Sequence, residues 1–201
     1  MSQDTKEKKN LRQSTWNETY SCQGGGFVTF CRHFKYLGSW ISFSLREDHD
    51  ITKRLAASNA SMGEMSKIWD DDHVDTYSKY LLFKAIPCNL LLWGCKSWAL
   101  RKCLLASLEV FLHREIRRIP KIRISKVIEQ HITNTSIRKK LYNIPMIKNQ
   151  IALRKLTYLG KIFRHEESHI PTRLLTVWCD HPRKSGRPIL TNKKSMVRNI
   201  Q

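Results

Sequence analysis

The sequence predicts a mainly α-helical protein with a short β-hairpin near its N-terminus. Apolar residues recur every three or four positions through most of residues 44–165, which is the spacing of one face of a helix. The exception is a β-rich run, FVTFCRHFKYLGSWI, at residues 27–41. The two ends of the chain are polar or basic and lack any regular apolar pattern. Helices therefore form the body of the predicted fold.

These patterns divide the chain into five predicted segments. Residues 1–26 form a disordered N-terminal segment, and residues 27–43 form the β-hairpin. Residues 44–124 form a helical bundle, and residues 125–180 form a basic helical region. Residues 181–201 form a basic tail that contains Pro and Gly.

The strand signal is strongest in FKYLGSWI, from Phe34 to Ile41, where bulky side chains alternate as they do along a strand. Three glycines, Gly24 to Gly26, precede it as a flexible hinge or as a hairpin turn. No Gly-Lys-Ser/Thr follows them, so they do not form a phosphate-binding loop.

The first predicted helix opens at Ser44, which has capping-box spacing to Glu47. It extends for about 22 residues, along an apolar stripe that ends at Trp69. Asp70, Asp71 and Asp72 end it as a solvated turn.

The second predicted helix begins near Asp75 and is kinked at Pro87, which lacks the N–H that the helix ladder needs. CNLLLWGCKSWAL follows and is apolar almost all round, so it is expected at the buried centre. A third helix carries an apolar stripe from Leu104 to Ile119 and stops at Pro120. Further helices are predicted at residues 125–131, 135–142 and 146–165, and after Pro171.

Composition narrows the class of protein. The 201 residues are 41% hydrophobic, enough for a core, but no run reaches the ~18 apolar residues of a membrane span. The N-terminus has no apolar signal-peptide core, so we expect an intracellular protein, cytoplasmic or nuclear, without a membrane partner. Its six cysteines form no C-x-x-C pair and are expected to be reduced and mostly in the core.

The positive charge is concentrated in the second half of the chain. The net charge is +19, and residues 101–201 hold 23 Lys and Arg against 6 Asp and Glu. Residues 1–100 hold 13 and 11, which is close to balance. A field of this sign attracts polyanions, so the sequence predicts phosphate contacts with nucleic acid.

Several motifs occur in an order that resembles a known family. They are FKYLGSWI, LLFKAI, LLLWGCKSWAL, LEVFLHREIRRIPKIR, LRKLTYLGKIFRHEE and RKSGRP. In this order and spacing they are similar to the C-terminal portion of a non-LTR retrotransposon reverse transcriptase, part of an endonuclease–reverse transcriptase polyprotein. The resemblance covers about residues 27–199.

The resemblance implies roles for particular residues. Phe34, Lys35, Tyr36, Leu37 and Gly38 match the primer grip, the hairpin that holds the primer terminus beside the thumb. The helices after it match the thumb, which closes over an RNA/DNA template–primer duplex. The residues expected to contact its phosphates are Arg114, Arg117, Arg118, Lys121, Arg123, Arg154, Lys155, Arg164, Arg183, Lys184 and Arg187.

The chain also departs from the family. The family's polymerase needs palm carboxylates that hold two Mg²⁺ ions, usually in an aromatic-Ala-Asp-Asp motif before the primer grip. No such motif occurs here, and Asp70 to Asp72 follow a Trp in the wrong place. The family's aromatic-Gly-Cys-Glu is Trp93-Gly94-Cys95-Lys96 here. We therefore expect a truncated, inactive fragment with no catalytic residues and no cofactor of its own.

Other interpretations stay open. His165, His169, Cys179 and His181 could ligate a metal, although their spacing matches no common zinc site. The tail RKSGRP resembles an AT-hook core. The chain could instead be a non-enzymatic helical interaction module that associates with itself through an exposed apolar face, or a gene-model fragment without a selected function.

Overall fold

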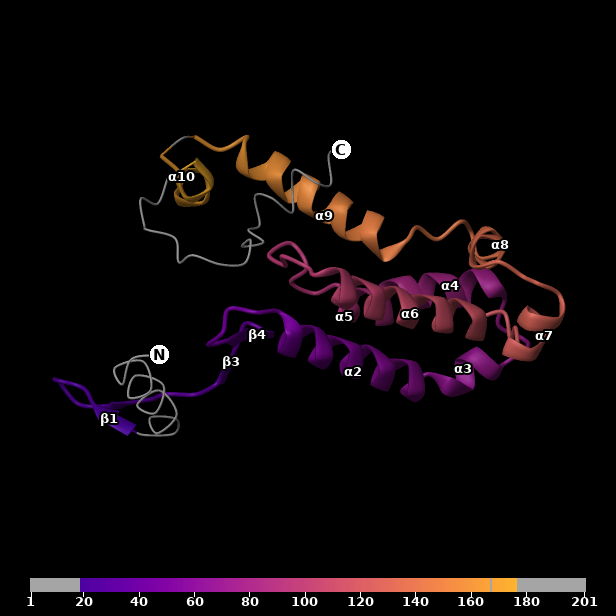
Figure 1. The fold of residues 1–201 in the computed structure, drawn as a ribbon, viewed down its shortest axis with the longest axis horizontal. Coiled ribbons are helices and arrows are strands. Elements are labelled where there is room, and N and C mark those ends of the chain that lie inside the picture. Colours follow the sequence, from indigo (N-terminus) through magenta and orange to yellow (C-terminus); the bar gives the residue numbers. More distant parts are fainter. Residues whose placement is uncertain (1–18, 167, 177–201) are drawn as a thin grey trace, which may run out of the picture. The chain divides into compact units, whose positions relative to one another are not determined.

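The computed structural model describes residues 19–166 and 168–176 of a chain that divides into two compact units, residues 1–50 and 51–201 (Figure 1). The fold is mainly α-helical, with two short antiparallel hairpins in the first unit, so the predicted fold class is confirmed. The basic tail lies outside the described residues, as do the first 18 residues of the predicted disordered segment.

The first hairpin joins β1 (Thr19–Ser21) to β2 (Phe27–Thr29). Gly24, Gly25 and Gly26 turn the chain between them with φ angles of 104°, 88° and 98°, which favour glycine because it has no Cβ. The glycines therefore form a hairpin turn, and disorder up to residue 26 was a wrong prediction. Residues 19–21 pair with β2, so β2 is not paired with the strand that follows it.

The second hairpin joins β3 (His33–Tyr36) to β4 (Ser39–Ser42). Leu37 and Gly38 form a two-residue turn with φ angles of 46° and 87°. Two successive positive φ angles are typical of the type I′ turn, whose twist matches the strands beside it. FKYLGSWI is therefore a hairpin and not one continuous strand.

The two faces of this hairpin differ. On one face Trp40 packs its ring edge-on to His49 at 5.1 Å, and His33 stacks on His49 at 3.8 Å. The backbone N–H of Trp40 donates to Oδ1 of Asp50 (3.0 Å). These contacts fix the hairpin to the first turn of the helix after it. Phe34 and Ile41 pair across the strands on the other face, which is exposed.

The first long helix, α2 (Asp48–Glu64), begins four residues later than the capping pattern predicts. Leu45 has a φ of 53°, and its N–H donates to the oxygen of Ser42 (2.9 Å), so this segment is a turn. The side chain of Ser44 bonds to that of Ser42 instead of capping the helix (2.9 Å). Acidic Asp48 and Asp50 occupy the first turn, where the helix dipole favours them.

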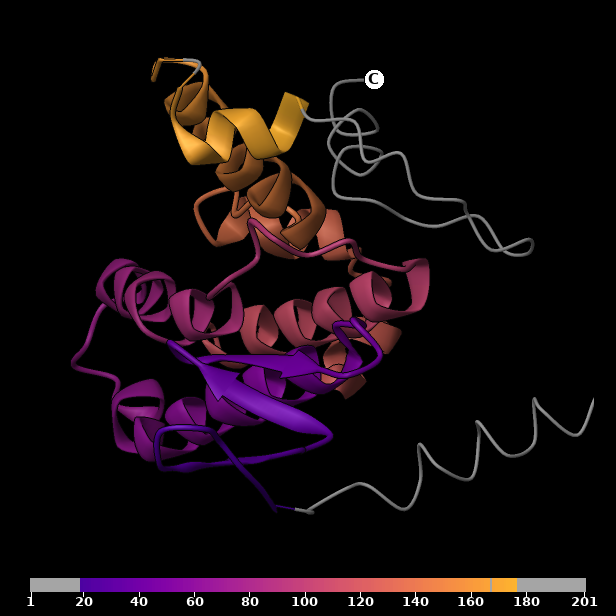
Figure 2. The same cartoon turned by 90° about the vertical axis from the view of Figure 1, so that its left-hand side faces the viewer.

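The second unit contains the remaining helices. They are α3 (Ser66–Asp70), α4 (Thr76–Ala85), α5 (Pro87–Leu91), α6 (Lys102–Arg118), α7 (Ile124–Glu129), α8 (Asn134–Lys140), α9 (Ile147–Ile162) and α10 (Ile170–Thr176). α6 packs against α8 and α9, and α4 packs against α5 (Figures 1 and 2). No helix among the described residues is long and apolar enough to cross a membrane.

Local signals set most of these boundaries. Met65 separates α2 from α3, so the predicted single helix is two, and the indole of Trp69 donates to the oxygen of Met62 (2.9 Å). Asp75 caps α4 by accepting from the N–H groups of Tyr77 and Ser78. Pro87 is the first residue of α5, where its missing N–H does no harm, so the helix predicted to kink at Pro87 is two helices.

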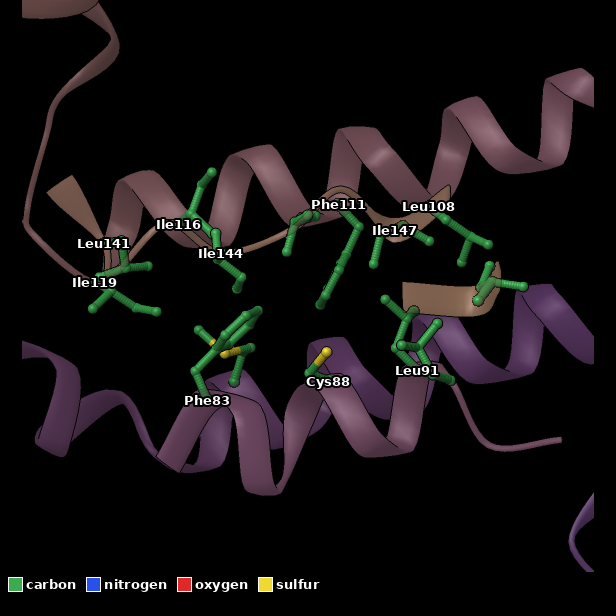
Figure 3. Close-up of a cluster of buried hydrophobic side chains, with 14 of the residues drawn as sticks. Phe83, Cys88, Leu91, Leu108, Phe111, Ile116, Ile119, Leu141, Ile144 and Ile147 are labelled. Atoms are coloured by element: carbon green, nitrogen blue, oxygen red, sulfur yellow. The ribbon is translucent and has the colours of Figure 1, made fainter. Parts of the chain in front are cut away.

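One hydrophobic core holds the second unit together (Figure 3). Phe83 and Leu91, from α4 and α5, face Leu108 and Ile116 of α6. Ile147 from the start of α9 completes this layer. Cys88 and Cys95 are buried, whereas Cys22, Cys31 and Cys103 are exposed, so most of the cysteines that the structure describes lie outside the core.

Candidate nucleic-acid interface

The primer-grip-like residues lie on the second hairpin. Phe34, Lys35 and Tyr36 belong to β3, and Leu37 and Gly38 form its turn. The side chains of Phe34 and Tyr36 are each 56% exposed. They occupy alternate positions of one strand and so share a face, as the pleat of a strand requires. The FKYLG run therefore presents an open aromatic face beside a tight turn.

Several of the predicted phosphate-binding residues gather where α6 ends. Arg117 and Arg118 occupy its last turn, where cations also stabilise the negative end of the helix dipole. Arg123 directly precedes α7. The chain turns sharply at Lys121, whose φ is 55°, and this turn keeps the start of α7 beside the end of α6 (Figure 1).

α8 brings a further cation to this end of α6. Arg117 and Arg138 both lie close enough to His113 to act on its charge, although burial is the main reason that its pKa is lowered. We call Arg117, Arg118, Arg123, Lys126 and Arg138 the α6–α8 basic cluster. The side chains of these five residues make no hydrogen bond or ion pair within the described part of the chain.

Two predicted residues near this cluster already have protein partners. Arg114 bonds to Asn59 of α2 and pairs with the buried carboxylate of Glu115 (2.5 Å). Lys121 donates to the oxygen of Asp70 (2.8 Å) and pairs with Asp72 (2.5 Å). Asp70 is the last residue of α3, and Asp71 and Asp72 follow it, so this acidic run ends the helix as predicted. Arg114 and Lys121 therefore hold helices together.

On α9 the structure corrects one prediction. Lys155 is only 1% exposed, and its Nζ donates to the oxygen of Trp98 (2.5 Å). It cannot reach a phosphate while this structure is intact. Its position was readable in the sequence, because it lies four residues after Ile151 on the buried stripe of the helix.

The other two predicted residues of this region, Arg154 and Arg164, are less buried than Lys155 but also have hydrogen-bond partners. Arg154 donates to Asn89 (2.5 Å) and to the oxygen of Leu92 (3.3 Å), so it completes the end of α5. Arg164 follows α9, and its Nε donates to the oxygen of Gly160 (2.8 Å). Arg164 is exposed, and this single bond leaves most of its guanidinium donors available to a ligand.

The remaining predicted residues, Arg183, Lys184 and Arg187, lie outside the described residues, as do Cys179 and His181. The rings of His165 and His169 stack at 4.5 Å. The described residues contain no group of three or more His, Cys, Asp or Glu side chains that could hold a metal.

The sequence prediction missed several residues. Arg138 joins the basic cluster through the packing of α8 on α6, which no local spacing signals. Lys126 joins it from α7, which follows the turn at Lys121. Trp93, in the run expected at the buried centre, is 54% exposed. Tyr77 is 49% exposed and lies in the first turn of α4, two residues after the cap Asp75.

The chain shows no similarity that identifies it. No protein-family model matches, and neither a curated protein nor a solved structure is similar to it. The function is therefore argued from the site alone.

Proposed function

We propose that the chain binds nucleic acid duplexes through their phosphates, without reading sequence, as the primer-grip and thumb portion of a non-LTR retrotransposon reverse transcriptase. The observation that carries this proposal is the α6–α8 basic cluster. Its five cations come from α6, from α7 with its N-cap, and from α8, and their side chains make no hydrogen bond or ion pair with another described residue.

Charge and geometry favour a polyanion over a small anion. The cluster spans the end of α6, the start of α7 and α8, so its charges are spread over a surface and not gathered in a pocket. A duplex presents about one negative charge per 1.7 Å of its axis, which suits spread cations. Arg also forms two parallel hydrogen bonds to a phosphate, and four of the five residues are Arg.

The proposal assigns no chemical step to this chain. Its sequence has no aromatic-Ala-Asp-Asp motif, and in the acidic run from Asp70 to Asp72 the oxygen of Asp70 and the carboxylate of Asp72 are engaged by Lys121. The chain would position a template–primer duplex, and polymerisation would need carboxylates and Mg²⁺ that these residues do not supply.

A salt titration tests the proposal. We expect the affinity for an RNA–DNA heteroduplex to fall linearly on a log–log plot between about 50 and 200 mM salt. In the double variant Arg118→Gln/Arg123→Gln the slope should become shallower by roughly two, one for each phosphate that the variant no longer neutralises.

A charge-matched control is available. Lys102→Gln/Lys161→Gln removes the same charge from exposed positions at the start of α6 and on α9. If long-range charge alone attracts the duplex, both double variants will change the slope equally and the assigned cluster is wrong. A salt-independent affinity in the unaltered protein would overturn nucleic-acid binding itself.

One observation favours a second candidate, a protein-interaction module. Phe34, Tyr36 and Ile41 share the open face of the second hairpin and are 56%, 56% and 49% exposed. Exposed apolar faces commonly mark protein contacts. Light scattering distinguishes the candidates, because a dimer that forms without nucleic acid and is lost in Phe34→Ser would favour the module.

A further inference from the structure

A groove runs between α4, α5 and α9, and its lining includes no residue of the α6–α8 basic cluster. Its volume is about 670 Å³, within the range of roughly 300–1,000 Å³ for ligand sites. Tyr80 and Lys84 of α4 line one side, and Leu153 and Arg154 of α9 line the other. The groove is thus an apolar channel with a positive charge on each wall.

An aromatic cluster stands at one end of the groove. Tyr80 lies 5.3 Å from Tyr142 and 6.4 Å from Tyr77, between ring centroids, and Tyr77 and Tyr142 lie 4.9 Å apart. Tyr77 is 49% exposed and Tyr142 is 50% exposed. Because Tyr80 belongs to both features, the three rings, here called the tyrosine cluster, continue the wall of the groove onto the surface.

Tyr142 is held in this position by an unfavourable backbone conformation. Tyr142 and Asn143 have φ angles of 51° and 54°, a conformation that non-glycine residues rarely adopt. Strained backbone of this kind occurs at binding sites more often than elsewhere. Here it brings Tyr142, from the turn between α8 and α9, against the two tyrosines of α4.

The charges in the groove have one sign. The side chain of Lys84 makes no hydrogen bond or ion pair with another described residue. Arg154 is held by Asn89 and Leu92, which use two of its five N–H donors and fix its orientation. Asp75, two residues before Tyr77, has a carboxylate that already accepts two N–H groups of α4.

Two side-chain amides, of Asn149 and Gln150, also line the groove, and one of them is available to a ligand. Gln150 is occupied, since it accepts from the thiol of Cys88 (3.2 Å) and donates to the oxygen of Pro145 (2.9 Å). Asn149 also lines the groove, and its side chain makes no hydrogen bond within the described part of the chain. An Asn amide can pair with a base edge through its donor and acceptor.

We propose that the tyrosine cluster and this groove bind unpaired nucleotides of a single strand. Bases would stack on Tyr77 and Tyr142, and the phosphates would pass Lys84 and Arg154. Aromatic rings beside a cationic groove are the usual means of holding single strands without sequence preference. The inference rests on the proposed nucleic-acid function and adds a second surface, specific for unpaired strands.

The test compares single-strand and duplex binding in the full chain. The probes are a labelled oligothymidylate of about a dozen nucleotides, within the usual site size, and a duplex of the same length. In Tyr77→Ala/Tyr142→Ala we expect single-strand affinity to fall roughly five- to 100-fold, as for the loss of one stacked base, and duplex affinity to stay within about twofold. Tyr77→Phe/Tyr142→Phe keeps the rings and should bind as the unaltered protein does.

Two controls keep the test decisive. Tyr158→Ala removes an exposed tyrosine of α9 that lies outside the groove lining and should leave both affinities unchanged. Lys84→Gln should reduce the salt slope for the single strand alone by about 0.7, the value for one neutralised phosphate.

Three further results would overturn either the single-strand site or the proposed function. Duplex binding with unchanged single-strand affinity in the double alanine variant would overturn this inference and leave the proposed function intact. Absence of both affinities at low salt in the unaltered protein would overturn the proposed function. An acidic amphipathic peptide that displaces the oligothymidylate and binds more tightly would identify the groove as a peptide site and overturn the inference.

Discussion

The ammonium of Lys155 on α9 donates to the main-chain oxygen of Trp98, a residue 57 positions earlier. The side chain is buried, so this bond satisfies a carbonyl that water cannot reach. Lys155→Met keeps most of the aliphatic stem and removes this buried hydrogen bond. We expect the free energy of unfolding to fall by about 1–3 kcal/mol in chemical denaturation.

Lys148→Met is the matched control for this prediction. Lys148 is also on α9, but its side chain is exposed. Its replacement should change stability by no more than about 0.5 kcal/mol, as is usual at the surface. Equal stability of the two variants would show that the buried bond contributes nothing. Weaker duplex binding by Lys155→Met without a fall in stability would restore Lys155 as a binding residue.

Ser58 on α2 and Pro87 form a second buried link. The hydroxyl of Ser58 donates to the oxygen of Pro87 (2.8 Å), and Ser58 is fully buried. We expect Ser58→Ala to lower the free energy of unfolding by about 1 kcal/mol, measured in urea. Ser107→Ala removes a similar bond, to Cys103, from an exposed site and should have a smaller effect. The reverse ranking would contradict the role of Ser58.

Burial of Cys88 predicts how stability depends on pH. Desolvation raises the pKa of the Cys88 thiol from its ordinary value of 9.0 to about 11, against smaller lowering effects of Arg154 and Lys84. Between these two values only the unfolded chain releases the thiol proton, so rising pH favours unfolding. The contribution is complete below pH 9.0 and is lost as the pH rises toward about 11.

The measurement compares unfolding free energies of the unaltered protein and Cys88→Ala across this pH window. Their difference should shift by up to about 1.4 kcal/mol per pH unit, and should be constant below the window. Cys103→Ala, which removes an exposed thiol, should track the unaltered protein throughout. A constant difference for Cys88→Ala over the whole range would show that its thiol ionises equally in both states.

Periodicity in the sequence was enough to predict the helices, because burial of one face imposes a spacing that survives in the residues. Asp75 marked the start of a helix and Pro87 marked an irregularity in it, because both depend on local backbone chemistry. The turn at Leu37 was harder, since leucine rarely adopts a φ of 46° and so gives no turn signal. The helix start predicted at Ser44 was wrong, although the capping pattern is present in the sequence. Ser44 bonds to Ser42 in a turn that the sequence does not reveal.

The candidate site was predicted only in part. Spacing alone placed Arg117, Arg118 and Lys121 at the end of one helix. It could not show that Asp72 pairs with Lys121 or that Arg138 arrives from α8, since both depend on tertiary packing. Lysine on an apolar stripe, as at position 155, is a signal of burial that a count of charges overlooks.

The pair of Asp72 and Lys121 gives the last prediction. The side-chain bond from Lys121 lowers the pKa of the Asp72 carboxyl, so Asp72 stays ionised at neutral pH and partly neutralises this end of the molecule. Asp72→Asn removes that charge and releases Lys121 toward the duplex. We expect affinity for an RNA–DNA heteroduplex to rise and the salt slope to steepen by up to about one.

Stability should hardly change in Asp72→Asn, because exposed ion pairs contribute little. Asp75→Asn is not a suitable control, since Asp75 caps α4; Glu129→Gln, an exposed acid on α7, is better. If charge near the cluster is what counts, both variants will bind more tightly, but only Asp72→Asn will lose its gain when combined with Lys121→Gln. An equal gain in the Lys121→Gln background would show that Asp72 does not restrain that lysine.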